Sequence, residues 1–131
     1  MKNHILIEKK IGSFKKKINV GSDKSISIRT ILLASQAVGV SKISNLLESE
    51  DVLNTLKTVK KLGIDYSKSG NIYNIYGFGL NGYDIKKNTI LNAGNSGTLA
   101  RLILGLLVKT KHKIRLVGDK SLSKRDFSRV I

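Results

Sequence analysis

Two short segments of the sequence combine glycine with hydroxyl-bearing side chains, a composition suited to holding a small anion. The first is Gly21-Ser22-Asp23-Lys24-Ser25, and Arg29 follows shortly after it. Lysine supplies a compact positive charge there, and arginine supplies a planar pair of donors for an oxyanion. The second is Gly94-Asn95-Ser96-Gly97-Thr98, where glycine lets the backbone approach a bound group and the hydroxyls can donate to it. Both segments therefore predict a cradle for phosphate or carboxylate.

Each segment is expected to lie between a strand and a helix. The short apolar runs Ile5–Ile7 and Ile18–Val20 predict strands before the first segment, and Ser25–Val38 predicts an amphipathic helix after it. Thr89–Ala93 and Leu99–Val108 predict a strand and a helix around the second segment. The first turn of a helix carries unpaired N–H groups and the positive end of the helix dipole. Both turns would therefore offer an anion further donors.

Helix capping is an alternative explanation for the same residues. Ser22, Asp23 and Ser25 are all good N-cap residues, and a glycine-serine turn before a helix is common. Neither segment has the glycine and lysine spacing of a P-loop or of a dinucleotide-binding fingerprint. From local composition alone, the anion cradle and the plain helix cap both stay open.

The elements between the two segments alternate in a regular order. Gly39 is expected to end the first helix at its C′ position. In order, the sequence then predicts a strand over Val40–Ser44, a helix from Ser49-Glu50-Asp51 to Gly63, and a hairpin over residues 64–76 whose turn is Ser67–Asn71. With the preceding strand and helix, this makes a β-α-β-α-β-β unit.

The pattern then begins again. Ser25 and Thr98 are 73 positions apart, and a strand predicted over Lys113–Val117 stands at the same offset from the strand at Val40. Asp126 is expected to open the next helix. The repeat predicts a domain assembled from copies of one supersecondary unit. The second copy stops at Ile131, so we expect an incomplete domain.

The net charge of the chain suggests a different class of function. Lys and Arg number 24 against 9 Asp and Glu, a net charge of +15, which is typical of small nucleic-acid-binding proteins. The excess lies mainly at the two ends, with +5 in residues 1–20 and +6 in residues 109–131. The run Lys15-Lys16-Lys17 lacks the interleaved aromatic residues that stack on bases. We interpret it as solvated surface, with a small basic RNA-binding protein or a stand-alone anion-binding module as alternatives.

The composition also excludes several kinds of chemistry. The chain has no cysteine and two histidines, so a disulfide framework, a thiolate metal site and a cysteine nucleophile are excluded, and no zinc site is expected. The longest apolar stretch, Leu102–Val108, is far short of the roughly 20 residues that span a bilayer. We therefore predict a cytoplasmic protein without metal or membrane partners. The interpretation of the charge as solvated surface further predicts no nucleic-acid partner.

Four segments together resemble one protein family. Gly21–Arg29 is similar to the G-S/D-K-S-x-S-x-R segment of the 5-enolpyruvylshikimate-3-phosphate (EPSP) synthases. Three further segments are similar to its N-x-L-x-S-x-D-V, N-A-G-N-S-G-T and G-D-x-S-L-x-x-R motifs, in the same order: Asn45–Val52, Asn92–Thr98 and Gly118–Arg125. The likeness begins at about residue 15 and covers roughly the first third of the family's chain.

The resemblance implies a fold. Members of this family are α+β proteins of two similar domains, each built from three βαβαββ units in an inside-out barrel, with the substrates bound between the domains. It implies that residues 1–20 form strands that pair with the C-terminal domain, which is absent here. Residues 21–131 would be an incomplete first domain with one full and one partial unit. The chain is thus expected to be an N-terminal fragment.

The resemblance also implies an activity, that of 3-phosphoshikimate 1-carboxyvinyltransferase in aromatic amino acid biosynthesis. Such an enzyme transfers the enolpyruvyl group of phosphoenolpyruvate to the 5-hydroxyl of shikimate 3-phosphate and releases phosphate. It is expected to need no cofactor and to work as a monomer. The groups that the family uses for proton transfer lie mostly in its second domain, so the chain alone is expected to be inactive.

The family's site residues carry over to matching positions. The resemblance implies that shikimate 3-phosphate contacts Lys24, Ser25 and Arg29, and that phosphoenolpyruvate contacts Lys24, Asn95, Gly97, Thr98 and Arg125. Lys24 would also act in catalysis, by offsetting charge as the intermediate forms. Asp126 stands where many members have proline. It would either weaken the hold of Arg125 on an anion or cap the next helix, and we favour the cap.

Overall fold

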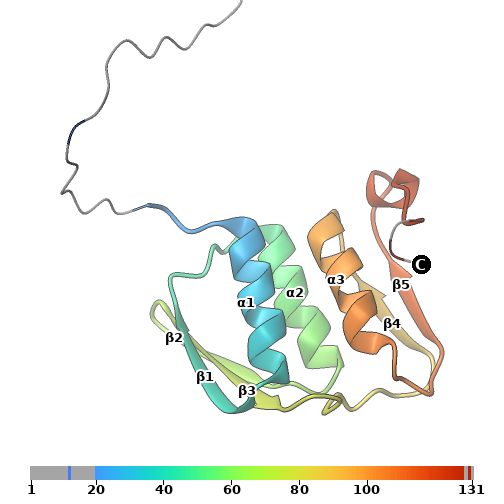
Figure 1. Cartoon of the computed structure of the whole chain (residues 1–131), viewed down its shortest axis with the longest axis horizontal. Helices are drawn as coiled ribbons and strands as arrows, with labels where there is room; N and C mark the ends of the chain where they lie inside the picture. The colour runs from blue at the N-terminus through green and yellow to red at the C-terminus, as the bar shows by residue number, and fades with distance from the viewer. Residues whose placement is uncertain (1–11, 13–19, 129, 131) are drawn as a thin grey trace, which may run out of the picture.

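The computed structural model describes residue 12, residues 20–128 and residue 130 (Figure 1). The strand expected at Ile5–Ile7 and all but the last residue of the one at Ile18–Val20 lie outside the described residues. Val20 is described, and it is an exposed residue outside any strand. The expected pairing of residues 1–20 thus falls almost wholly on residues that are not described.

Helices and strands alternate through the described chain. In order they are α1 (Lys24–Gln36), β1 (Val38–Ser44), α2 (Glu50–Lys61), β2 (Tyr66–Ser69), β3 (Ile72–Phe78), β4 (Thr89–Asn92), α3 (Gly97–Leu107), β5 (Ile114–Val117) and the short 3₁₀ helix η1 (Leu122–Lys124). This mixture of helix and strand agrees with the predicted α+β class. Every element predicted between residues 25 and 117 is present, with shifted ends.

Helix α1 begins at a strong cap and is held by one apolar face. The Asp23 carboxylate accepts the backbone N–H of Ile26 at 2.7 Å. Ile28, Ile31 and Leu32 are buried at the spacing of a single helix face, and burying each side chain contributes roughly 1.5–3 kcal/mol. The opposite face, which carries Arg29, stays exposed.

Helix α1 ends two residues before Val38, and the prediction that Gly39 caps it is wrong. Gly39 lies within β1, opposite Gly77, with a φ of +90°. The carbonyl of Ala37 accepts the N–H of Gly79 from the end of β3 at 3.0 Å. Because the neighbouring strand satisfies this carbonyl, the chain enters β1 directly and needs no glycine cap.

The first sheet has the antiparallel order β1-β3-β2. Strands β2 and β3 form the predicted hairpin, but the turn is shorter than Ser67–Asn71, because β2 runs to Ser69 and only two residues connect the strands. One of them, Gly70, has a φ of +55°, in the left-handed region that two-residue hairpin turns require.

The second sheet confirms the strand-helix-strand order predicted for the second unit. Strands β4 and β5 are parallel, with Leu91 opposite Leu116, and α3 connects them. Helix α3 begins at Gly97, two residues before the predicted start, because Ser96 caps it. The Ser96 Oγ accepts the N–H of Leu99 at 3.2 Å.

The helix predicted from Asp126 is wrong. Its carboxylate accepts the N–H of Ser128 at 2.8 Å, and the turn that follows is closed by the N–H of Val130 donating to the Phe127 carbonyl at 2.9 Å. A helix becomes stable only when several consecutive hydrogen-bonded turns form. A single turn of this kind does not reach that length.

One apolar core joins both units. Ile31 of α1, Leu56 of α2, Ile75 of β3, Leu91 of β4 and Ile103 of α3 are all fully buried in it. The three helices lie side by side and begin at the same end of the molecule (Figure 1). Among the described residues, no helix is both long and apolar enough to cross a membrane. The core thus gathers the two glycine-bearing segments at one end.

Candidate functional site

The first turn of α2 connects the two glycine-bearing segments. On one side, the Nζ atom of Lys24 lies 2.9 Å from the Oδ2 atom of Asp51. On the other, Gly94 packs so closely on α2 that an added Cβ would collide with the side-chain amide of Asn54, with the Glu50 carboxylate 4.0 Å away. Segments 73 residues apart in the sequence therefore border the same turn of one helix.

Three predicted residues gather at the start of α1. Lys24 and Ser25 stand in its first turn, and the Nη1 atom of Arg29 donates to the carbonyl of Ser25 at 3.1 Å. Asp23 is the residue that caps this helix, so capping leaves the other polar groups of the segment available. The structure therefore brings Lys24, Ser25 and Arg29 together, as expected.

The pairing of Asp51 with Lys24, a predicted site residue, is a contact that sequence reasoning missed. The sequence identified Asp51 only as an acid in the first turn of α2, where it also interacts favourably with the helix dipole. Its side chain is 14% exposed, whereas that of Lys24 is 52% exposed. The acid is thus the fixed partner of the pair, and it directs the lysine ammonium toward the start of α2. Its presence in the motif Asn45–Val52 was the available signal.

The second segment forms the start of α3. Asn92 holds the turn through its Oδ1 atom, which accepts the N–H of Gly94 at 2.9 Å, and Ser96 is buried as the cap. Gly97 and Thr98 are the first two residues of the helix. The N–H groups at such positions have no acceptor within the helix, and of the two residues Gly97 is buried and Thr98 half-buried.

Arg125 reaches this turn from a distant loop. Its Nη2 atom donates to the Oδ1 atom of Asn95 at 3.0 Å. A Cβ at Gly97 would lie 2.7 Å from its Nη1 atom, so the guanidinium group covers the start of α3. The Asn95 amide in turn donates to Asp119 Oδ2 at 2.6 Å. Asn95, Gly97 and Arg125, which the sequence placed in one anion site, are in fact neighbours.

The comparisons with known proteins decide the family. The family model described as EPSP synthase (3-phosphoshikimate 1-carboxyvinyltransferase) matches residues 8–131. The chain belongs to the EPSP synthase family. The match begins before residue 15, where the sequence motifs alone suggested that it starts.

Curated relatives and solved structures agree with this family. The chain is 51% identical over 114 residues to a 3-phosphoshikimate 1-carboxyvinyltransferase of Ruthia magnifica, covering 87% of this chain and 26% of the relative. It is 42% identical over 113 residues to that of Bacillus cytotoxicus, covering 86% and 26%. The EPSP synthase from Acinetobacter baumannii superposes with a TM-score of 0.76 at 36% identity, covering 89% of this chain and 27% of that one. The chain thus spans about a quarter of its relatives' length, less than the expected third.

The chain departs from the EPSP synthase pattern at Asp126, whose carboxylate bonds to Ser128 and not to Arg125. Both carboxylate oxygens of Asp126 are taken by Ser128, whose N–H lies at 2.8 Å and whose Oγ lies at 2.7 Å. The backbone N–H of Ser128 is also the main cause that holds the pKa of Asp126 below its ordinary value. Asp126 thus caps a turn and not the expected helix, and its effect on anion binding by Arg125 stays a prediction.

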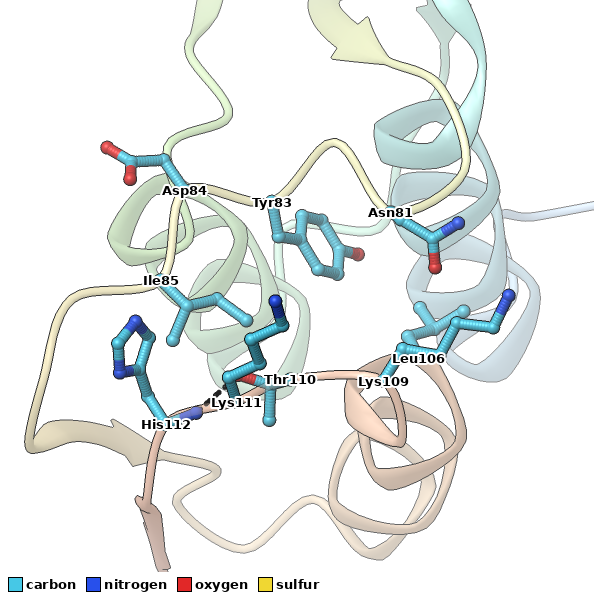
Figure 2. Close-up of a pocket in the computed structure, with 9 residues that line it drawn as sticks. All are labelled: Asn81, Tyr83, Asp84, Ile85, Leu106, Lys109, Thr110, Lys111 and His112. Carbon is cyan, nitrogen blue, oxygen red and sulfur yellow. Dashed lines mark hydrogen bonds between the residues drawn. The ribbon is translucent and has the colours of Figure 1, made fainter.

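A separate cavity of about 340 Å³ lies at the other end of the helices (Figure 2). Lys109 and Lys111 line it, just beyond the C-terminus of α3, where cations interact favourably with the helix dipole. Tyr83 also lines it, and its hydroxyl lies 2.7 Å from Ser35 Oγ. No predicted site residue lines this cavity. Within the described residues, no group of acids and histidines could hold a metal ion.

Proposed function

We propose that this chain is part of a 3-phosphoshikimate 1-carboxyvinyltransferase, and that it supplies part of the site that binds shikimate 3-phosphate and phosphoenolpyruvate. The reaction joins the enolpyruvyl group to the 5-hydroxyl of shikimate 3-phosphate and releases phosphate. The observation that supports this most directly is the convergence of two cationic turns on α2, one with Lys24 and one with Arg125. Both substrates are anions with several charges, which such an arrangement favours.

The α1 turn is proposed to hold shikimate 3-phosphate. Arg29 lies one helical turn after Ser25 and bonds back to it, so a phosphate near the Ser25 hydroxyl would lie within reach of a planar, two-pronged donor. Lys24 lies beside them. Because Asp51 fixes its ammonium group on the side of α2, Lys24 would stand between the two substrates and offset the charge that develops during the reaction.

The α3 turn is proposed to hold phosphoenolpyruvate. The N–H groups of Gly97 and Thr98 and the positive end of the α3 dipole would face its acidic groups. Arg125 would add a charge-assisted bond from its place over Gly97, where the lack of a side chain leaves room for it. Asn95 would hold the guanidinium plane in its orientation.

The finer fold assignment belongs to the same proposal. We propose that residues 21–131 are one complete and one partial βαβαββ unit of the family's inside-out barrel, and that residues 1–20 pair with a second domain. The order of α1 to β3, followed by β4, α3 and β5, supports the repeat. The cytoplasmic location and the monomeric state stay predictions.

Ligand titration of the 131-residue chain tests the proposal. Backbone amide NMR signals should shift on addition of shikimate 3-phosphate at Ser25 and on addition of phosphoenolpyruvate at Gly97 and Thr98, with no turnover by the chain alone. Arg29→Gln should weaken shikimate 3-phosphate binding about 10- to 100-fold, as expected for a hydrogen bond between charged groups.

Lys111→Gln is the matched control, because it removes the same charge at the opposite end of the helices. It should leave both affinities unchanged. Equal losses in the two variants would show that net charge alone binds these anions and would overturn the proposed sites. Strong binding of single-stranded RNA with a steep salt dependence would favour the RNA-binding alternative instead.

A further inference from the structure

We propose that Asp119 is a positioning residue, which aims Arg125 at the start of α3 by fixing the orientation of Asn95. The inference rests on the proposed function, because it concerns how the phosphoenolpyruvate half of that site is kept in order. The family motif contains Asp119, but the motif assigned no role to this residue. Three side chains from two segments, the turn after β4 and the loop after β5, carry the argument: Asn95, Asp119 and Arg125.

The order of donors and acceptors allows one arrangement of these groups. Asp119 Oδ2 accepts the Asn95 amide at 2.6 Å, and the amide oxygen of Asn95 accepts Arg125 Nη2 at 3.0 Å. A carboxylate can only accept and a guanidinium can only donate. If the Asn95 amide flipped, its oxygen would face the carboxylate and its NH₂ group would face the guanidinium. Asp119 therefore holds the carbonyl of Asn95 toward Arg125.

Asp119 is itself held on several sides. Its Oδ1 atom accepts the N–H of Leu122 at 2.7 Å, its own N–H donates to the Gly94 carbonyl at 2.9 Å, and its carbonyl accepts the N–H of Ser123 at 2.9 Å. The Leu122 side chain is buried in the core. Asp119 is thus anchored both to the turn before α3 and to η1. A carboxylate held this rigidly can orient the Asn95 amide that bonds to it.

The ionised form of Asp119 is favoured by the same contacts. The hydrogen bond from Asn95 and then the backbone N–H of Leu122 hold the pKa of Asp119 below its ordinary value. The carboxylate therefore stays an acceptor at neutral pH. A protonated acid could donate to Asn95, and then the amide would lose its single orientation.

Acting through a neutral amide leaves the charge of Arg125 largely available. A carboxylate bound directly to Arg125 would orient it, but it would also offset the charge that attracts an anionic substrate. With Asn95 in between, the acid lies one side chain further from the guanidinium, and Coulomb energy falls with distance. Arg125 is then fixed over Gly97 and still able to bind an anion.

The test compares two acid-to-amide changes in the 131-residue chain. Asp119→Asn should weaken phosphoenolpyruvate binding about tenfold, the order of one charge-assisted hydrogen bond, and should leave shikimate 3-phosphate binding unchanged. Asp126→Asn is the control, since it removes the same charge next to Arg125 but from a carboxylate bonded to Ser128. It should leave phosphoenolpyruvate binding unchanged. Equal losses in both variants would overturn the proposal.

An exchange of the two side chains separates positioning from simple stability. The double variant Asn95→Asp with Asp119→Asn restores a donor-acceptor chain but sets the carboxylate directly against Arg125. We expect its thermal midpoint to recover relative to Asp119→Asn while phosphoenolpyruvate affinity stays low. Recovery of affinity together with stability would show a merely structural role and overturn the proposal.

A ligand-free measurement keeps this proposal distinct from the proposed function. The guanidinium NMR signals of Arg125 should show hindered rotation in the unaltered chain and free rotation in Asp119→Asn. Hindered rotation in both the unaltered chain and Asp119→Asn would overturn the positioning role, whatever the ligand titrations show. If the unaltered chain shows hindered rotation but binds no phosphoenolpyruvate, the proposed function fails while the control of Arg125 by Asp119 is upheld.

Discussion

The starts of α1 and α3 place a cation beside a helix N-terminus in two different ways. At α1 the cation, Lys24, belongs to the first helical turn and pairs directly with Asp51. At α3 the cation, Arg125, comes from a loop and is held by the neutral amide of Asn95, with an acid behind it. The direct pair fixes the ammonium and partly offsets its charge, whereas the indirect arrangement fixes the guanidinium and keeps its charge. Similar backbone turns can therefore present cations of different effective strength.

The largest effect is expected at the cation that serves both turns. Lys24→Met should reduce the affinities for shikimate 3-phosphate and for phosphoenolpyruvate by about 100-fold each, since charge-assisted bonds contribute roughly 1.5–3 kcal/mol. Isothermal titration of each ligand measures both losses. A loss confined to one ligand would break the comparison, because Lys24 would then belong to a single turn.

A smaller and more selective effect is expected at Gly97. A methyl group there would lie 2.7 Å from Arg125 Nη1, so Gly97→Ala should displace the guanidinium and weaken phosphoenolpyruvate binding about tenfold, the loss of roughly one charge-assisted bond. Shikimate 3-phosphate binding should not change. The flexible arginine can move aside, so the free energy of unfolding should stay within about 0.5 kcal/mol of its original value.

Gly105 provides the matched control in the same helix. A Cβ there meets nothing within 4 Å, and alanine is favoured over glycine in a helix by about 1 kcal/mol. Gly105→Ala should therefore stabilise the chain by roughly that amount in urea denaturation and leave both affinities unchanged. Weakened phosphoenolpyruvate binding in Gly105→Ala would show that the effect at Gly97 is not local to Arg125.

The smallest effect concerns the loop that leads into α2, the helix that both turns border. Glu48, in the loop that leads into α2, binds Lys68 at 2.6 Å and accepts the Tyr73 hydroxyl at 3.0 Å. The hydrogen bond from Lys68 and then that from Tyr73 lower the pKa of Glu48 below its usual value of 4.5. A lowered folded-state pKa adds stability above the unfolded-state value, and this stability is lost as pH falls through the folded-state value.

Glu48→Gln should therefore lower the thermal midpoint slightly at pH 7, and the difference from the unaltered chain should disappear in acid, below the usual pKa of 4.5. Thermal melts across this pH range measure it. The pair is exposed, so the difference should also shrink in high salt. A difference that persists unchanged in acid would show that the ionised form of Glu48 has no part in holding this loop.

The sequence predicts elements well where local signals agree. For α2, the acids Glu50 and Asp51 at the start and Gly63 after the end enclose an apolar pattern of helical spacing, and the helix found is Glu50–Lys61. At Gly39 the local signal failed, because the carbonyl of Ala37 is satisfied by Gly79, the residue just after β3. At Asp126 a capping residue was present, but the described residues that follow it form a turn and no helix. Local capping residues therefore indicate where a helix could begin or end, and tertiary contacts determine which of these positions is used.

The sequence named the residues of the candidate site but did not predict how their side chains pair. Motifs identified Lys24, Arg29 and Arg125 as cations for anionic ligands. That Lys24 pairs with Asp51 depends on how α1 packs against α2, and no local pattern records that packing. The contact between Asn95 and Arg125 likewise spans 30 positions. Side-chain partners at such separations follow from the three-dimensional fold. The sequence therefore predicts which side chains take part, but not which of them pair with one another.

The common direction of the three helices has a consequence for folding as well as for binding. Helices that lie side by side and begin at the same end bring the positive ends of their dipoles together, and like charges repel. The cations of the site, Arg29 and Arg125, add to this repulsion while no anion is bound. The architecture therefore implies a trade-off between the proposed anion binding and stability. Neutralising Arg125 should slightly raise the free energy of unfolding of the ligand-free chain. A bound anion should raise the free energy of unfolding of the unaltered chain for the same reason.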